Sequence, residues 1–447
     1  MGHISQKNLT SKLVAGVGVV DITPKDTQFL CGYPHVERYS VGVNDPLLSS
    51  ALYLSDGTTS VIFISNDIVL LTKEIVKDIR CRIAERTGID PHNIMVTANH
   101  THSGPITFDA ICCEADTVVP GADKSYVKFM EDCIVDSAIK AYGNARPACV
   151  GLGIADGSGV GTNRRSPQGP SDPQVPVLLV QDENDGKMLA CMLVCSMHPT
   201  VLHEDSKYIS GDFPAFTRMY LQQNVLGKDC VVLYHTGPSG NQSPRHVTRE
   251  NTFAEAQRIG DILGKAVEKI LPTIQFEPSV AVKRSTAMIE LPRRTFPSVV
   301  DAQQKLDKAV ARLDHLRKIA APRQEVRTAE CDWFGAEETL TLAIAATDGR
   351  LAQAYQTVMP AEIQIIKIND WIFVGWQGEM FVEYALELKK FFADTFVISL
   401  ANGELQGYIV TKSADEEGGY EASNAMFSYE SGDLLVQNTA TLLQKGF

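Results

Sequence analysis

The chain has 447 residues, of which 44% are hydrophobic and 21% are charged, and this is the composition of an ordinary globular protein. Its 41 basic and 54 acidic residues give a formal net charge of −13, without any block rich in Lys or Arg. We therefore expect no binding to nucleic acid. No apolar run reaches the roughly 18 to 20 residues of a membrane span.

Strands are expected first at 12–22, 47–54 and 60–66, and a helix is expected over 73–87. Ile75, Ile79 and Ile83 repeat at helical spacing along that helix, and a glycine ends it. Another strand begins at residue 94. This strand–helix–strand order predicts an α/β fold in which helices flank mixed β-sheets.

The later elements follow from the same signals of periodicity and punctuation. They are a helix over 126–142, a strand over 148–154, a long loop over 156–176, a hairpin of 177–180 with 188–196, a strand over 228–235, a helix over 251–270, helical segments over 297–321 and 323–355, a strand-like run over 361–375, a helix over 382–392 and a strand over 395–400. We interpret residues 1–447 as one integrated domain in which 297–355 is a helical insertion.

The strand that begins at residue 94 runs into a His-Thr-His sequence and stops at Gly104-Pro105. Because side chains alternate along a strand, His100 and His102 are expected on one face, roughly 6 to 7 Å apart. Such a pair is suited to a divalent metal, with one histidine as ligand and the other behind it. Histidines that only satisfy hydrogen bonds at a strand end are the alternative.

Other predicted strands also end in polar clusters, at His198, at Asn241–Ser243 and at Glu379. Sites in open α/β sheets form at the carboxyl ends of strands, so these clusters are expected to meet. Two histidines and a carboxylate are the usual protein ligands of a catalytic zinc ion with an open position. His203 and His235 flank these motifs, and we expect them to be supporting or simply buried histidines.

Several motifs in this order resemble the neutral/alkaline non-lysosomal ceramidases over nearly the whole chain. The matching pieces are Gly16-Val17-Gly18-Val19-Val20-Asp21-Ile22-Thr23, His100-Thr101-His102-Ser103-Gly104-Pro105, Asn163-Arg164, His198-Pro199, Gly240-Asn241-Gln242-Ser243-Pro244, Gly378-Glu379 and Tyr408-Ile409-Val410-Thr411. The His-Thr-His-Ser-Gly-Pro match is highly specific, whereas each of the others is weak by itself.

The resemblance implies one zinc ion per chain and assigns a role to each matching residue. The zinc ligands would be His100, His198, Glu379 and Tyr408, with Tyr420 as a competitor for Tyr408. His102 would face the scissile amide, and Arg164 and Tyr408 would supply hydrogen bonds to the oxyanion. Ser243 would be a nucleophile or a hydrogen-bonding residue of the site, and a serine that caps a turn is the alternative.

The chain also departs from the family pattern. Asn241 stands where the ceramidases carry an aspartate, and Arg165 is an additional arginine after Arg164. The aromatic residue that precedes the tyrosine in the family is replaced by Gly407. Only 27 residues follow Tyr420, so the C-terminal immunoglobulin-like domain of the family is not expected. Because the first residues lack an apolar core, a secretion leader is not expected either. These differences leave the metal site intact but make ceramide itself less certain as the substrate.

The sequence thus predicts a zinc-dependent amidohydrolase in which metal-bound hydroxide attacks the amide of an N-acyl lipid or a related acylated amine. Two alternatives stay open: the same chemistry on a small non-lipid amide or ester, and a non-catalytic metal-binding relative. A long apolar groove would favour the lipid, and a short polar cavity the small substrate. The scattered ten cysteines and the absence of a signal sequence favour a reducing, cytoplasmic location. Nothing in the sequence specifies the oligomeric state.

Overall fold

The computed structural model describes residues 12–446, so the expectation for the start of the chain lies outside the described residues. A mixed sheet of nine strands forms the centre of the fold, in the order β11-β9-β8-β6-β1-β3-β4-β5, with β13 paired to β6. Its strands are β1 (Val14–Asp21), β3 (Leu48–Ser55), β4 (Ser60–Asn66), β5 (Ile94–Ala98), β6 (Arg146–Asp156), β8 (Gln174–Asp182), β9 (Met188–Cys195), β11 (Val231–Thr236) and β13 (Phe276–Glu277). Within it, β4 and β5 are parallel, and so are β9 and β11.

A second sheet of four strands has the order β14-β15-β16-β18. Its strands are β14 (Val282–Ile289), β15 (Ala361–Ile368), β16 (Trp371–Trp376) and β18 (Thr395–Ile398). Three two-stranded pairs complete the strands: β2 (Gly42–Val43) with β10 (Tyr208–Ile209), β7 (Thr162–Asn163) with β12 (Gln242–Ser243), and β17 (Glu379–Met380) with β19 (Tyr408–Ile409).

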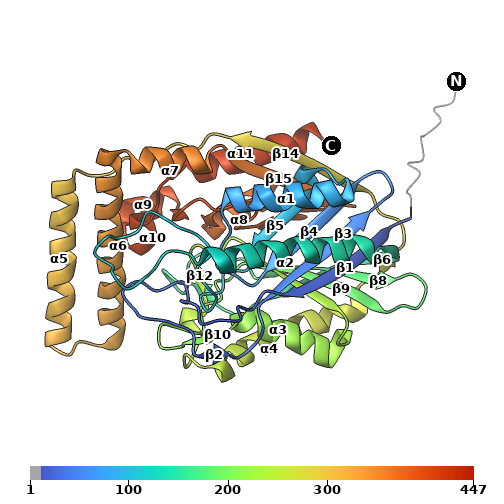
Figure 1. Cartoon of the computed structure of the whole chain (residues 1–447), viewed down its shortest axis with the longest axis horizontal. Helices are drawn as coiled ribbons and strands as arrows, with labels where there is room; N and C mark the ends of the chain where they lie inside the picture. The colour runs from blue at the N-terminus through green and yellow to red at the C-terminus, as the bar shows by residue number, and fades with distance from the viewer. Residues whose placement is uncertain (1–11, 447) are drawn as a thin grey trace.

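The two sheets pack face to face, with helices on both outer surfaces (Figure 1). Side chains alternate along each strand, so successive residues pack into different hydrophobic cores on the two faces of the sheet. In β4, Val61 and Phe63 pack between the sheets with Phe373 and Phe396 of the second sheet, whereas Ile62 and Ile64 face helices. The expected α/β fold with mixed sheets flanked by helices is therefore confirmed.

Helices cover the large sheet on one side of the molecule and the small sheet on the other. Those on the large sheet are α1 (Lys73–Thr87), α2 (Lys124–Gly143), α3 (Asp212–Leu221) and α4 (Phe253–Ile270). Those around the small sheet are α7 (Arg350–Val358), α8 (Val382–Phe391) and α11 (Glu430–Lys445), with the short α9 (Lys412–Glu417) and α10 (Tyr420–Ser423) nearby. None of the helices within residues 12–446 has the length and apolar character needed to cross a membrane.

The predicted helical insertion consists of α5 (Val299–Lys318) and α6 (Arg323–Asp348), which pair along their length and project from one end of the molecule (Figure 1). The insertion also contributes to the core, because Leu342 and Ala345 of α6 and Tyr355 of α7 pack with the small sheet. All ten cysteines are free, as expected.

Candidate metal centre

The candidate site lies where strands of both sheets end. His100 follows β5 by two residues, His198 follows β9 by three, and Glu379 follows β16 by three. Ser399, just after β18, donates its backbone N–H to the carbonyl of Thr236 at the end of β11, which joins the two sheets at this edge. The predicted meeting of polar strand ends is therefore present in the structure.

The expected geometry of the His-Thr-His segment was wrong in one respect. The strand stops at Ala98, and His100 has a φ of 71°, so strand alternation does not place the two histidines. Instead the chain turns sharply at His100, and its imidazole centroid lies 5.0 Å from that of His102. The turn is held because the His100 N–H donates to the carbonyl of Ile68.

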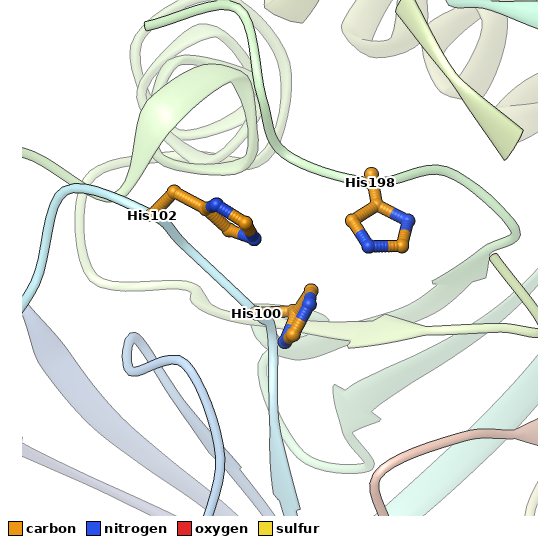
Figure 2. Close-up of side chains that lie close together, drawn as sticks. All are labelled: His100, His102 and His198. Carbon is orange, nitrogen blue, oxygen red and sulfur yellow. The ribbon is translucent and has the colours of Figure 1, made fainter. Parts of the chain in front are cut away.

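Three imidazoles converge at this point, from His100, His102 and His198 (Figure 2). One nitrogen from each lies within 4.8 Å of the others. The carboxylate of Glu379 completes the cluster, with Oε2 3.0 Å from Nε2 of His198 and 3.3 Å from Nε2 of His100. The structure therefore brings together three of the four predicted ligands and adds His102 to them.

Backbone carbonyls orient two of the rings. Nδ1 of His100 lies 2.7 Å from the carbonyl oxygen of Val69, and Nδ1 of His198 lies 2.5 Å from that of Ser239. Because a carbonyl oxygen can only accept, both Nδ1 atoms carry a proton, and both Nε2 atoms face the carboxylate of Glu379. This arrangement is typical of histidines that bind a metal. Burial opposes it, but the charge of Glu379 raises the pKa of His100.

The charges of the cluster are strongly coupled. Although burial opposes it, the two histidines hold the pKa of Glu379 well below its ordinary value. Burial, together with the charge of Arg164, lowers the pKa of His198 to about 4. Burial also lowers the pKa of His102 well below its ordinary value, with His100 adding to the effect. His102 and His198 are thus neutral, as metal ligands or proton acceptors must be.

Both ring nitrogens of His102 are buried, and neither has a hydrogen-bond partner among the described residues. Buried polar atoms normally have a partner, so this imidazole is prepared for a group that the protein itself does not supply. Imidazoles and a carboxylate are the donor set that zinc prefers. The residues present therefore fit a metal ion.

Tyr408 reaches the cluster through a two-stranded pair, because β17 and β19 place Tyr408 directly opposite Glu379. Burial, followed by the charge of Glu379, raises the pKa of its phenol well above the ordinary value. Tyr420, the competing tyrosine, lies behind it, with the two ring centroids 6.0 Å apart. Of the two tyrosines, Tyr408 is the one that pairs with a candidate ligand.

Arg164 lies over the ring of Tyr408, with its guanidinium carbon 5.3 Å from the centroid. Its Nε donates to Oε1 of Glu421 at 2.8 Å, while its buried Nη2 has no partner among the described residues. Arg165, the additional arginine, donates to the other oxygen of Glu421 and to Glu417. Both arginines thus bind Glu421, and Arg164 is the one that also lies over Tyr408, whereas Arg165 also contacts Glu417 of α9.

Ser243 is buried on β12, which pairs with β7 and so brings the serine segment beside the loop of Arg164. Its Oγ accepts the backbone N–H of Arg245 at 3.3 Å and caps a short 3₁₀ helix (Pro244–His246). This is the capping role that the sequence offered as the alternative. The predicted part of Ser243 in chemistry stays a prediction.

The contacts of Asn241 explain why this chain has an asparagine where the family has an aspartate. Asn241 Nδ2 donates to Oε2 of Glu383 at 2.7 Å, and its Oδ1 accepts the N–H of Val382 and the side chain of Gln242. An aspartate would place two carboxylates against each other at this position. The amide therefore matches the neighbouring glutamate of this chain.

His203 and His235, the two histidines that flank the motifs, lie in different surroundings. Nδ1 of His235 lies 2.8 Å from Oγ1 of Thr97, and burial lowers its pKa to about 3, so His235 is a neutral core residue outside the cluster. His203 stacks on Tyr33, with their centroids 5.8 Å apart. Tyr33 in turn meets the edge of the His102 ring at 5.6 Å.

The sequence interpretation missed the segment around residues 31–38. Arg38 is completely buried and donates to the carbonyls of Cys31 and His102, which ties this segment to the His-Thr-His turn. Next to it lies a cavity of about 230 Å³ whose lining includes Gly32, Tyr33 and Tyr420. The only available signal was the Cys31-Gly32-Tyr33-Pro34 sequence, a turn-forming segment without titratable charge.

Comparison with known proteins agrees with these features. Residues 13–247, more than half of the chain, match the model of the family described as "Neutral/alkaline non-lysosomal ceramidase, N-terminal". The neutral ceramidase of Pseudomonas aeruginosa is 23% identical over 287 residues, which cover 57% of this chain and 42% of that protein. The neutral ceramidase of Mycobacterium tuberculosis is 23% identical over 235 residues, or 48% of this chain and 37% of that one. The chain thus spans about two fifths of these relatives.

The fold is similar to that of solved ceramidase structures. The crystal structure of the Pseudomonas aeruginosa neutral ceramidase superposes with a TM-score of 0.73 at 17% identity, covering 96% of this chain and 73% of that one. A structure described as "Ceramidase complexed with C2" gives a TM-score of 0.73 at 16% identity, with 97% and 76% covered. From the family match and the shared fold, we conclude that the chain belongs to the neutral/alkaline non-lysosomal ceramidase family.

Proposed function

We propose that this protein is a zinc-dependent hydrolase of the amide bond in acylated amines. The observation that carries the proposal is the convergence of three buried imidazoles and the carboxylate of Glu379, with Tyr408 paired to that glutamate. In this proposal His100, His198, Glu379 and Tyr408 hold one zinc ion. Family membership supports an amide substrate, since the relatives are named neutral ceramidases.

Zinc held by these residues would polarise a carbonyl and lower the pKa of a bound water to about 7. The other roles fall to side chains of the chain itself. His102 is neutral and its nitrogens are free, so it can accept a proton and pass it to the departing amine nitrogen. The overall reaction consumes one water and releases a carboxylic acid and an amine.

In this proposal Arg164 and Tyr408 stabilise the negative charge that develops on the carbonyl oxygen. Arg164 has an N–H group, Nη2, that is buried without a partner, and Glu421 fixes the orientation of its guanidinium. The phenol of Tyr408 remains protonated in the protein alone and can donate. Donors that are oriented in advance contribute several kcal/mol each to such reactions, typically about 3 to 4.

The same chemistry on a small amide is a second candidate, and the cavity favours it over a lipid with two long chains. Its volume of about 230 Å³ is below the roughly 300–1,000 Å³ of most ligand pockets. The lining is neither a long apolar groove nor purely polar, since Phe29, Tyr33 and Phe334 alternate with carboxylates. A short acyl group or a short amine fits this space better than ceramide.

The first test is metal content, measured by elemental analysis on wild type, His100→Ala and Glu379→Gln. We expect about one zinc per chain in wild type and its loss in His100→Ala, because removing one nitrogen ligand opens the site. His235→Ala is the matched control, since His235 is equally buried but lies outside the cluster. A wild-type protein that binds no zinc even after addition of the metal would overturn the proposal.

The second test is activity on a panel of N-acyl amines of different chain length. Removal of the metal by a chelator should abolish hydrolysis, and addition of zinc should restore it. A zinc-loaded protein that cleaves none of the panel would instead identify a metal-binding relative without this activity.

A further inference from the structure

The cavity of about 230 Å³ lies between α6, the segment 112–119 and the turn at residues 31–34. Its lining contains none of the candidate ligands, but two of its residues contact the metal centre. Gly32 lies so close to His102 that the two are in van der Waals contact, and Tyr420 packs on Tyr408. A molecule in this cavity is therefore separated from His102 by the backbone of Gly32, and both buried ring nitrogens of His102 have no partner among the described residues.

The walls of the cavity carry acidic side chains. Asp116, Glu337 and Glu338 line the cavity, and among the described lining residues none is a lysine or arginine. His35 contacts two of these carboxylates, since its Nε2 lies 2.5 Å from Glu337 and its backbone N–H donates to Asp116. Glu338 has no such contact with His35, and no lysine or arginine pairs with it among the described residues.

Glu338 is nevertheless firmly positioned. Gln406 donates to Oε1 of Glu338 at 3.2 Å. The side-chain amide of Gln406 is itself held by the backbone of Ile111, because it accepts the N–H of Ile111 and donates to the carbonyl of Ile111. The second carboxylate oxygen has no protein partner among the described residues. Burial, together with the nearby Glu337, raises the pKa of Glu338 to about 7. A buried carboxylate without a cation is costly, so a positively charged ligand would stabilise it.

We propose that this cavity binds the amine half of the substrate and that this amine carries a second, positively charged nitrogen, as in an N-acylated diamine. The inference rests on the proposed amide hydrolysis and names its substrate class. The aromatic side chains of Tyr33 and Phe334 enclose the methylene chain, and Glu338 accepts a hydrogen bond from the terminal ammonium group. Water adds to the acyl carbon, the C–N bond breaks, and the diamine leaves with the proton gained by its nitrogen.

The test compares two amides of equal size, N-(4-aminobutyl)hexanamide and N-pentylhexanamide, which differ in an ammonium against a methyl group. A charge-assisted hydrogen bond predicts a kcat/KM about tenfold or more higher for the aminobutyl compound. In Glu338→Gln this preference should fall to less than about threefold. Glu404→Gln is the matched control, because burial also raises the pKa of Glu404 to about 7, yet Glu404 does not line the cavity.

Binding of 1,4-diaminobutane, measured by calorimetry on the zinc-loaded protein, separates this inference from the proposed function. Diamine binding that Glu338→Gln abolishes supports the inference even if neither amide is cleaved, and the hydrolase proposal then fails alone. Hydrolysis of both amides at equal rates, without diamine binding, would overturn the inference and leave the hydrolase proposal standing. A preference for N-(4-hydroxybutyl)hexanamide over the aminobutyl compound would also overturn it, in favour of a neutral hydroxyl.

Discussion

Gly32 leaves no room for a side chain beside His102. Its φ is 111°, and a Cβ added there would lie 2.3 Å from Nδ1 and 2.6 Å from Cγ of that imidazole. Atoms cannot approach so closely, and the imidazole is enclosed by Tyr33 and by the turn that Arg38 holds. A methyl group at this position must therefore displace His102 from its place in the cluster.

Gly32→Ala should lower kcat/KM for an acyl amide at least about tenfold, because misplacement of a reacting group by even 1 Å is costly. Zinc content should remain near the wild-type value, since in our proposal the ligands are His100, His198, Glu379 and Tyr408. Kinetics and elemental analysis on the same preparation check both expectations.

Gly88→Ala is the matched control for this change. Gly88 also has a positive φ, of 72°, but nothing lies within 4 Å of an added Cβ. It should cost stability alone, about 1–2 kcal/mol, with unchanged kinetics. If Gly32→Ala leaves kcat/KM unchanged, His102 does not need its observed position.

At the scale of single residues, the sequence predicted which polar side chains meet but not the groups that hold them. His100, His198 and Glu379 could be found because a polar side chain after a buried strand is conspicuous. The carbonyls of Val69 and Ser239 that orient the rings could not, because any residue type supplies a carbonyl. Arg38 could not be placed either, since its acceptor on His102 lies 64 residues away in the chain.

At the scale of elements, the helix α3 supports the candidate site indirectly. Arg218 of α3 donates to Oδ2 of Asp67 at 2.8 Å, in the turn that follows β4. Asn99 donates to Oδ1 of the same carboxylate. The next residues of this turn, Ile68 and Val69, offer the carbonyls that hold His100. A buried ion pair thus fixes the turn that holds His100, the first candidate ligand.

Asp67→Asn should lower the free energy of unfolding by about 3–5 kcal/mol, because it leaves the buried guanidinium of Arg218 without its counter-charge. Unfolding in urea, followed by circular dichroism, measures the loss. Asp78→Asn is the control, since Asp78 pairs with Arg82 of the same helix at the surface, and such a pair contributes at most about 1 kcal/mol. Equal losses of unfolding free energy in the two variants would show that the buried pair stabilises the fold no more than the surface pair does.

Elements with strong local signals were predicted well. The helix over 73–87 has the expected bounds because Thr72 accepts the N–H of Ile75 at one end and Gly88 caps the other. The run 361–375 was expected to be strand-like throughout, but it forms two antiparallel strands with a turn at Asn369 and Asp370. Asparagine and aspartate favour turns, so this pair was a signal that the interpretation did not use. The strand β14, whose residues are largely exposed or half-buried, has no clear alternation and was missed.

For the whole molecule, the metal donors join two sheets that are far apart in the chain. His100 and His198 follow strands of the large sheet, whereas Glu379 and Tyr408 come from the part that contains the small sheet. The family match ends at residue 247, before the second pair. The large sheet also needs the small one to cover Leu52, Phe63 and their neighbours.

A fragment of residues 1–250 should therefore bind no zinc and should aggregate when expressed alone, because it exposes one face of the central sheet. Size-exclusion chromatography and elemental analysis test this, and co-expression with residues 251–447 should restore both properties. A monomeric fragment that binds zinc would contradict our interpretation of the chain as one integrated domain.

The helix α6 belongs both to the projecting hairpin and to the wall of the cavity. With 26 residues it is about 39 Å long. Phe334, Glu337 and Glu338 lie near its middle, and its far end is tied to the body by Arg327 and Glu204 at 3.2 Å. Between Glu338 and the end of the helix at Gly349, Leu342 and Ala345 pack with the small sheet. The hairpin is therefore anchored on both sides of Glu338, and the packing that joins it to the small sheet also fixes one wall of the cavity.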